Sequence, residues 1–196
     1  TMYEDYIHYV SSGIMLKPAS QFAKKVSKLY CRDCSAIIVP TQKVKDALHE
    51  YGLRRHIDVI PIGINIELFR KSNFDEKLIN DEKKSFGINE TQPVVLYIGR
   101  IAKEKSIDVI INSMTELIRK IPNCKLLLVG DGPERENLET LVKHLGIEKS
   151  VVFAGEKPWS EIGKYYQMGD VFVGASLTET QGLTFAEAMA AQIPVV

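Results

Sequence analysis

The chain has 196 residues, 45% of them hydrophobic and 26% charged, which is typical of an α/β protein with one large or two small domains. Lysine plus arginine equals aspartate plus glutamate at 25 each, so no overall positive charge favours a nucleic acid partner. No apolar run approaches the roughly 20 residues of a membrane span, and the first residues do not resemble a secretion signal. We therefore expect a cytoplasmic protein.

The three cysteines are an odd number and do not predict a disulfide framework. Cys31 and Cys34 form a CxxC pair, but a zinc site needs a second pair of Cys or His residues, and none lies nearby in the sequence. We expect no metal site, and two cysteines on one face of a helix.

Apolar side chains recur at helical spacing before Pro18 and again after it. In the second segment Lys24, Lys28 and Arg32 share one stripe, with Lys25 beside it, so this helix is basic and amphipathic. Such a helix can bind the inner, anionic face of a membrane. It can also pack against its own domain and expose its charges to water. The apolar positions are Tyr3, Tyr6, Ile7 and Val10 in the first segment, and Phe22, Val26, Leu29 and Tyr30 in the second.

Two short strands and a helix are predicted next. Residues 35–40 form an apolar strand, and Thr41 is a good N-cap for a helix that ends at Gly52. Residues 56–65 form a second strand that leads into a Pro-Gly turn.

The composition then changes, because residues 70–91 are rich in Asn, Asp, Glu and Lys. A change of this kind marks a crossing between domains. We therefore divide the chain into a first region at 1–64, a polar linker at 65–92 and a domain at 93–196.

From Pro93 onward apolar strands alternate with amphipathic helices. This alternation predicts an α/β fold with a parallel sheet covered by helices on both faces. Strands are predicted at 94–100, 125–132, 151–156 and 170–176, and helices at 107–121, from Pro133 to Gly146, and at 160–168.

The last eighteen residues, ETQGLTFAEAMAAQIPVV, contain a turn that opens a helix near Gly182. The free N–H groups and the dipole of a helix start attract anions. Glu179 before the turn and Glu187 in the helix could hold hydroxyl groups on two sides of a phosphate, which fits a nucleoside-diphosphate sugar. Glutamates near a helix start are also common because they suit the dipole.

In parallel sheets ligands bind beyond the carboxyl ends of the strands. Arg100 and Lys105 are expected near these strand ends, and their positive charges suit a diphosphate. Both could also be ordinary surface charges. Glycines let a backbone approach a ligand, and they are also common in ordinary turns between strands and helices. The residues expected on this rim are Gly99, Arg100, Lys105, Gly130, Asp131, Gly132, Gly155, Glu156, Lys157 and the segment 179–182.

Four motifs, GRIAKEKSID, VGDGPER, FAGEKP and ETQGLTFAEAMAAQIPVV, resemble in their order and spacing the donor domain of retaining glycosyltransferases of family 4. IPIGINIELF resembles the interdomain segment of the same family, and the match spans most of 59–196. The resemblance implies a GT-B fold, in which 93–196 is a Rossmann-type donor domain and 1–64 is the end of the acceptor domain.

The resemblance also implies roles for individual residues. Arg100 and Lys105 would bind the diphosphate and stabilise its departure, and Glu187 would hold the ribose. Glu179 would contact the donor sugar. The Gly182-Leu183 backbone would cradle phosphate or sugar, and the loop Gly155–Pro158 would lie beside the base.

The implied reaction transfers a sugar, with glucose from a UDP-sugar favoured, through an oxocarbenium-like transition state and with retention of configuration. Fixed positive charge would stabilise the leaving diphosphate, so neither a metal nor a cofactor is required. An Asp-x-Asp metal motif is absent from the sequence.

The first residues, TMYEDYIHY, resemble the acceptor domain of bacterial diacylglycerol glucosyltransferases within this family. Together with the basic helix they favour a membrane lipid as acceptor. The resemblance covers neither domain completely, so we expect an internal piece of a larger enzyme with little or no activity of its own. Two alternatives remain, namely a GT-B sugar-nucleotide epimerase and a module that binds sugar nucleotides without turnover. No oligomeric state is indicated.

Overall fold

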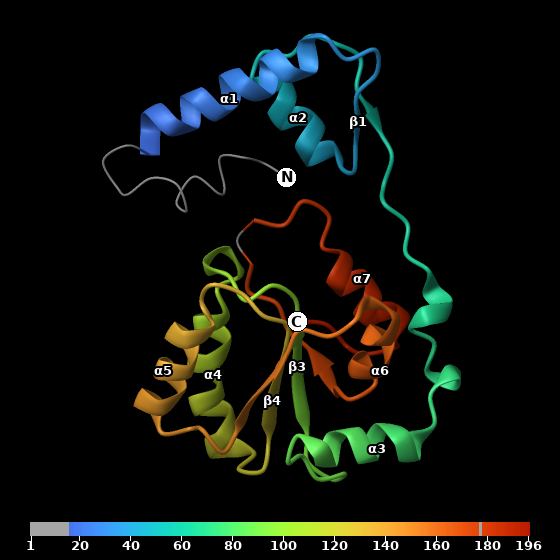
Figure 1. Cartoon of the computed structure of the whole chain (residues 1–196), viewed down its shortest axis with the longest axis vertical. Coiled ribbons are helices and arrows are strands. Elements are labelled where there is room, and N and C mark those ends of the chain that lie inside the picture. The colour runs from blue at the N-terminus through green and yellow to red at the C-terminus, as the bar shows by residue number, and fades with distance from the viewer. Residues whose placement is uncertain (1–15, 177) are drawn as a thin grey trace. The chain divides into compact units, whose positions relative to one another are not determined.

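The computed structural model describes residues 16–176 and 178–196 (Figure 1). The helix expected within residues 1–10 lies outside the described part. The chain forms two compact units. The first contains the described residues up to Gly63 together with Thr178–Gln181, and the second contains residues 64–176 and Gly182–Val196.

The first unit is built around a short parallel pair of strands, in which Ile38 is paired with Asp58. The Oγ1 atom of Thr41 accepts a hydrogen bond from the N–H of Val44, so the predicted N-cap is confirmed. A small core contains Ile37, Val39, Leu53 and Ile57. The elements are α1 (Leu16–Arg32), β1 (Ile38–Val39), α2 (Gln42–Glu50) and β2 (Asp58–Val59).

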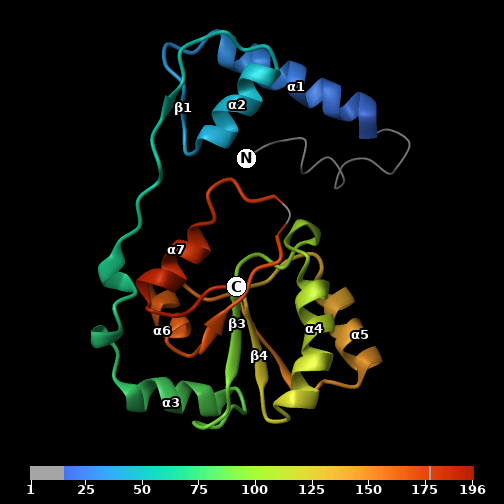
Figure 2. The same cartoon turned by 180° about the vertical axis from the view of Figure 1, so that it is seen from behind.

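The second unit contains a four-stranded parallel sheet in the order β5-β4-β3-β6. Successive residues of the central strand β3 face opposite cores, with Leu96 in one and Tyr97 in the other. Helices lie on both sides of the sheet (Figures 1 and 2). One side carries α4 (Ile107–Lys120) and α5 (Arg135–Leu145), and the other carries α6 (Ile162–Tyr166) and α7 (Leu183–Ala190). The strands are β3 (Val94–Ile98), β4 (Lys125–Val129), β5 (Val151–Gly155) and β6 (Val171–Phe172).

The helices of the second unit are α3 (Glu76–Ser85), α4 (Ile107–Lys120), α5 (Arg135–Leu145), α6 (Ile162–Tyr166) and α7 (Leu183–Ala190). Short 3-10 turns are η3 (Ile66–Leu68), η4 (Lys71–Asn73), η5 (Lys103–Lys105) and η6 (Trp159–Glu161). The predicted alternation of strands and helices from Pro93 is confirmed. A parallel bridge between Phe172 and Val195 continues the sheet beyond β6.

Several features differ from the sequence predictions. The strands expected at 35–40 and 56–65 are only two residues long, Ile38–Val39 and Asp58–Val59. Cys34 lies beyond the end of α1, so it does not share a helix face with Cys31. The strand expected at 170–176 is shorter, because only Val171 and Phe172 belong to the ladder with β3. The polar stretch after Arg70 contains helix α3, which the sequence pattern did not predict. Asp75 caps this helix by accepting a hydrogen bond of 2.8 Å from the N–H of Lys77. Its composition is polar because it buries only Ile79 and Lys83.

Candidate functional site

The loops that follow β3, β4 and β5 are joined by backbone hydrogen bonds. The N–H of Ile101 donates to the carbonyl of Asp131 at 2.9 Å, and the N–H of Gly130 donates to the carbonyl of Gly155 at 2.9 Å. Since these loops all leave the carboxyl ends of parallel strands, they form one continuous rim in the second unit.

A hollow of about 640 Å³ lies on this rim and is lined by Gly99, Arg100, Gly130, Asp131, Gly132 and Glu156. A Cβ atom on Gly130, whose φ is 136°, would lie 2.0 Å from the carbonyl oxygen of Gly99. A Cβ atom on Gly132 would lie 2.3 Å from the carbonyl oxygen of Ile101. Glycine is therefore required at both positions because neighbouring loops touch there, whatever ligand the hollow holds.

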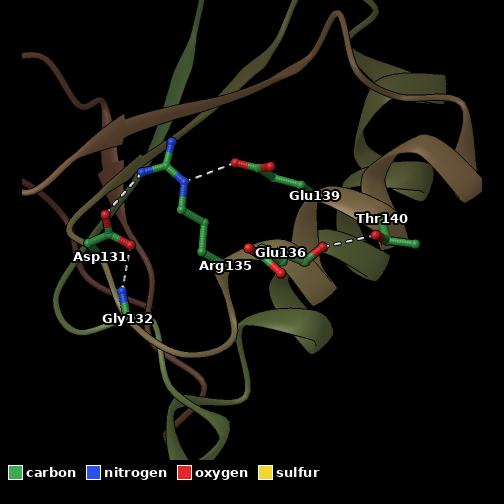
Figure 3. A network of polar contacts seen from close by, with 6 residues as sticks. All are labelled: Asp131, Gly132, Arg135, Glu136, Glu139 and Thr140. Carbon is green, nitrogen blue, oxygen red and sulfur yellow. Dashed lines mark hydrogen bonds and ion pairs between the residues drawn. The ribbon is translucent and has the colours of Figure 1, made fainter.

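Arg135, in the first turn of α5, holds the loop after β4 in place (Figure 3). Its Nε donates to Glu139 at 2.9 Å, and an NH group lies 3.2 Å from Asp131 Oδ2. The other carboxylate oxygen of Asp131 accepts from the N–H of Gly132 at 2.7 Å. The guanidinium also lies 5.8 Å from the centre of the Phe153 ring on β5. One side chain thus ties the turn at Asp131 to two neighbouring elements.

Lys105 ends the turn η5, which lies between β3 and α4. The hydroxyl of Ser176, beyond β6, donates to the carbonyl of Glu104 at 3.2 Å. The segment that carries Lys105 is thereby attached to the chain that leaves β6.

Gly182 is the N-cap of helix α7, so the helix begins where it was predicted to begin. The φ angle of Gly182 is 68°. No side chain among the described residues caps this helix. Phe185 packs edge-on against Phe172 with 5.3 Å between ring centres. A Cβ atom on Gly174 would lie 2.4 Å from the Phe185 ring, so a glycine beyond β6 allows the first turn of α7 to approach the sheet.

Glu187 is almost completely buried, with 7% of its surface exposed. Its Oε2 accepts a hydrogen bond of 2.7 Å from the hydroxyl of Tyr166 on α6. Burial raises the pKa of Glu187, and the bond from Tyr166 partly opposes that increase. Glu187 is therefore a carboxylate that is fixed in position and costly to ionise.

The contacts of two further predicted site residues, Glu179 and Lys157, are also defined. Glu179 belongs to the first unit, where its carbonyl accepts from Lys43 Nζ at 3.3 Å. Lys157 directs its ammonium to the rings of Phe86 and Tyr165, at 5.2 and 5.4 Å from their centres. Its neighbour Glu156 lines the hollow instead.

Sequence reasoning placed Glu156 on the rim but gave it no role, and it gave none to Arg135 or Tyr166. The position of Glu156 directly after a strand was the available signal. Tyr166 gave no signal, because a tyrosine at a helical core position is usually a packing residue.

Two models of glycosyltransferase families match this chain. The family model described as "Glycosyl transferases group 1" matches residues 79–196, and the model described as "Glycosyltransferase Family 4" matches residues 2–68. The chain belongs to the group 1 glycosyl transferases, and the predicted family is confirmed.

Two curated relatives match along the whole chain. The alpha-monoglucosyldiacylglycerol synthase of Acholeplasma laidlawii is 36% identical over 100% of this chain and 50% of its own length. The synthase of the same name from Streptococcus pneumoniae is 32% identical over 100% of this chain and 44% of its own length. The chain thus spans about half the length of these relatives.

Solved structures confirm the GT-B-like fold class. Sucrose-phosphate synthase from Thermosynechococcus elongatus matches with a TM-score of 0.77 and 26% identity over 97% of this chain and 47% of its own. Anabaena HepE in complex with UDP and glucose matches with a TM-score of 0.79 and 24% identity, over 90% of this chain and 48% of its own.

Proposed function

We propose that the second unit binds the nucleotide-diphosphate sugar of a retaining glycosyltransferase, with UDP-glucose as the donor. The observation that carries this proposal is the hollow at the carboxyl ends of the strands, where Arg100 stands among three glycines. A guanidinium beside a closely packed backbone suits a diphosphate. The HepE crystal structure is a complex with UDP and glucose, which supports this choice of donor.

The roles follow from the charges. Arg100 and Lys105 stabilise the negative charge that develops on the leaving diphosphate, and the uncapped start of α7 adds its dipole. Glu187 accepts hydrogen bonds from the ribose, and Glu179 contacts the sugar. The Gly182-Leu183 backbone lies against phosphate or sugar, and the Gly155–Pro158 loop lies against the base. No metal or cofactor takes part in this scheme.

The experiment that tests this function is calorimetric titration of the chain with UDP, UMP and GDP. We expect UDP to bind more tightly than UMP, because the second phosphate adds a charge-assisted contact of about 1.5–3 kcal/mol. GDP should bind more weakly than UDP, because we assign the Gly155–Pro158 loop to contacts with uracil. Equal affinity for UDP and UMP would contradict the roles of Arg100 and Lys105.

For the acceptor we propose a membrane lipid such as diacylglycerol, because both curated relatives are named alpha-monoglucosyldiacylglycerol synthase. Helix α1 would then lie on an anionic membrane surface. It exposes Phe22 and Tyr30, at 70% and 79%, together with the charges of Lys25 and Lys28. Two further cations have partners, since Lys24 faces the Tyr51 ring at 5.0 Å and Arg32 pairs with Asp33 at 3.1 Å. Among the described helices none is both long and apolar enough to cross a bilayer.

Sedimentation with vesicles containing anionic lipid tests the membrane proposal. The double variant Lys25→Glu, Lys28→Glu should bind these vesicles less, by about 1 kcal/mol for each charge removed. The matched control Lys120→Glu, Lys143→Glu changes the same charge on α4 and α5 and should bind like the wild type. Equal loss in both variants would mean that only net charge matters.

We also propose that these 196 residues bind the donor without transferring sugar, since the two relatives that match along the whole chain are about twice as long. Product analysis after incubation with UDP-glucose tests this. Unchanged donor is expected. Release of glucose or of an epimer would favour the alternative of an epimerase-like enzyme, and glucosylated lipid would show that the chain suffices for transfer.

A further inference from the structure

Tyr166 is the residue that fixes Glu187. Its hydroxyl lies 2.7 Å from Glu187 Oε2 and 3.3 Å from the carbonyl oxygen of Thr184. Thr184 lies in the first turn of α7 and Glu187 in the second, so one phenol contacts both turns. No hydrogen bond to the other oxygen, Oε1, occurs among residues 16–176 and 178–196.

Tyr166 is itself held rigidly. It has no exposed surface, and Phe69 packs edge-on against its ring at 5.4 Å with an interplanar angle of 79°. The ring of Phe172 also lies near that of Tyr166, with 5.9 Å between ring centres. The neighbouring Gln167 donates to the carbonyl of Phe69 at 2.8 Å, which fastens Phe69 to α6. The hydroxyl therefore has a fixed place from which to donate.

The Tyr166 hydroxyl is suited to act as a permanent hydrogen-bond donor. Burial raises the pKa of Tyr166 far above its usual range, so the phenol keeps its proton whenever the protein is folded. A buried carboxylate that receives one hydrogen bond still needs further donors, and hydroxyl groups of a ligand can supply them.

We propose that Tyr166 is a positioning residue for the donor site: its hydroxyl orients the Glu187 carboxylate and leaves Oε1 for the ribose hydroxyls of the nucleotide. This inference rests on the proposed function, which assigns the ribose to Glu187. It adds a residue that acts on the ligand only through another side chain.

Tyr166→Phe removes the hydroxyl and keeps the ring. The adjacent Tyr165→Phe is a matched control, because Tyr165 is also buried, at 2%, and its hydroxyl donates to another carboxylate, Glu82, at 3.0 Å. Each variant loses one phenol-to-carboxylate bond from the same helix. Circular dichroism and thermal unfolding check that both variants fold.

The measurement is calorimetric titration with two ligands, UDP and its 2′,3′-dideoxy analogue, which lacks the ribose hydroxyls. Tyr166→Phe should weaken UDP binding about three- to tenfold, the value of one hydrogen bond, and leave the analogue unchanged. Tyr165→Phe should leave both affinities unchanged.

Three results would contradict this role. Equal weakening of both ligands by Tyr166→Phe would show a general structural effect, and unchanged UDP affinity would show that Tyr166 has no role. Either result would overturn this inference and leave the donor site in place. Failure of the folded wild type to bind UDP would instead overturn the proposed donor site, and this inference with it.

Discussion

At the scale of single residues, Glu187 is placed where ionisation is unfavourable. Because burial raises its pKa in the folded protein, the folded state takes up a proton more readily than the unfolded state. The ionised group therefore costs stability near neutral pH, and that cost disappears as the pH falls towards the ordinary carboxyl value of 4.5. A residue kept in this state at a cost to stability is typical of a functional site.

This predicts opposite effects of Glu187→Gln on stability and binding. The amide can still accept from Tyr166 but carries no charge, so near neutral pH the free energy of unfolding should equal or exceed that of the wild type. The gain should shrink as the pH falls towards 4.5. UDP affinity should fall. Urea unfolding across this pH range measures the first effect, and a less stable variant near neutral pH would contradict the prediction.

Arg135 is expected to stabilise the rim through geometry more than through charge. Lysine cannot bridge Asp131 and Glu139 with a planar fork, so Arg135→Lys should lower the free energy of unfolding by about 0.5–1.5 kcal/mol. Arg119→Lys is the control, because Arg119 pairs with Glu116 at 2.7 Å but is 74% exposed. Exposed pairs contribute little, so the control should change stability hardly at all. Equal losses in the two variants would refute the role of the rim network.

At the scale of elements, helix α3 is joined to α6 by one partly buried carboxylate. Glu82 accepts from Lys164 Nζ at 2.9 Å and from Tyr165 at 3.0 Å. The hydrogen bond from Lys164 lowers the pKa of Glu82. A carboxylate with a lowered pKa contributes stability above its unfolded pKa, and this contribution is lost as the pH falls through the folded value.

We therefore expect Glu82→Ala to destabilise the protein by about 1–3 kcal/mol near neutral pH. The difference from the wild type should narrow below the ordinary carboxyl value of 4.5. Denaturant unfolding at both pH values is the measurement. A pH-independent difference would mean that lost packing, and not the ionic hydrogen bond, accounts for the effect.

The elements that the sequence predicted well are those defined locally. The strands after Pro93 are continuous apolar runs, and the starts of α2 and α7 depend on Thr41 and Gly182, which lie next to the helices they open. Local patterns of this kind are readable without a structure.

What the sequence did not reveal depends on residues far apart in the chain. Tyr166 and Glu187 are separated by 21 positions, and Glu82 and Lys164 by 82. Neither pair leaves a periodic signal. The rim glycines were predicted, but the reason for Gly130 and Gly132, which is contact between loops, became visible only in three dimensions.

At the scale of the whole molecule, the chain combines two units that belong to one enzyme family. Arg100 and Glu187 both lie in the second unit, whereas Glu179 lies with the first. Under the proposed roles, the second unit carries the contacts to diphosphate and ribose. Affinity for UDP should therefore depend on residues of the second unit.

The most direct test is calorimetric titration of the wild type, Arg100→Ala and Glu187→Ala with UDP and UDP-glucose. We expect the wild type to bind both ligands. Each variant should lose about 1.5–3 kcal/mol, roughly ten- to a hundredfold in affinity, because each loses a charge-assisted contact. Folded variants that bind UDP as tightly as the wild type, or a folded wild type that does not bind it, would contradict the assignment of this rim as the donor site.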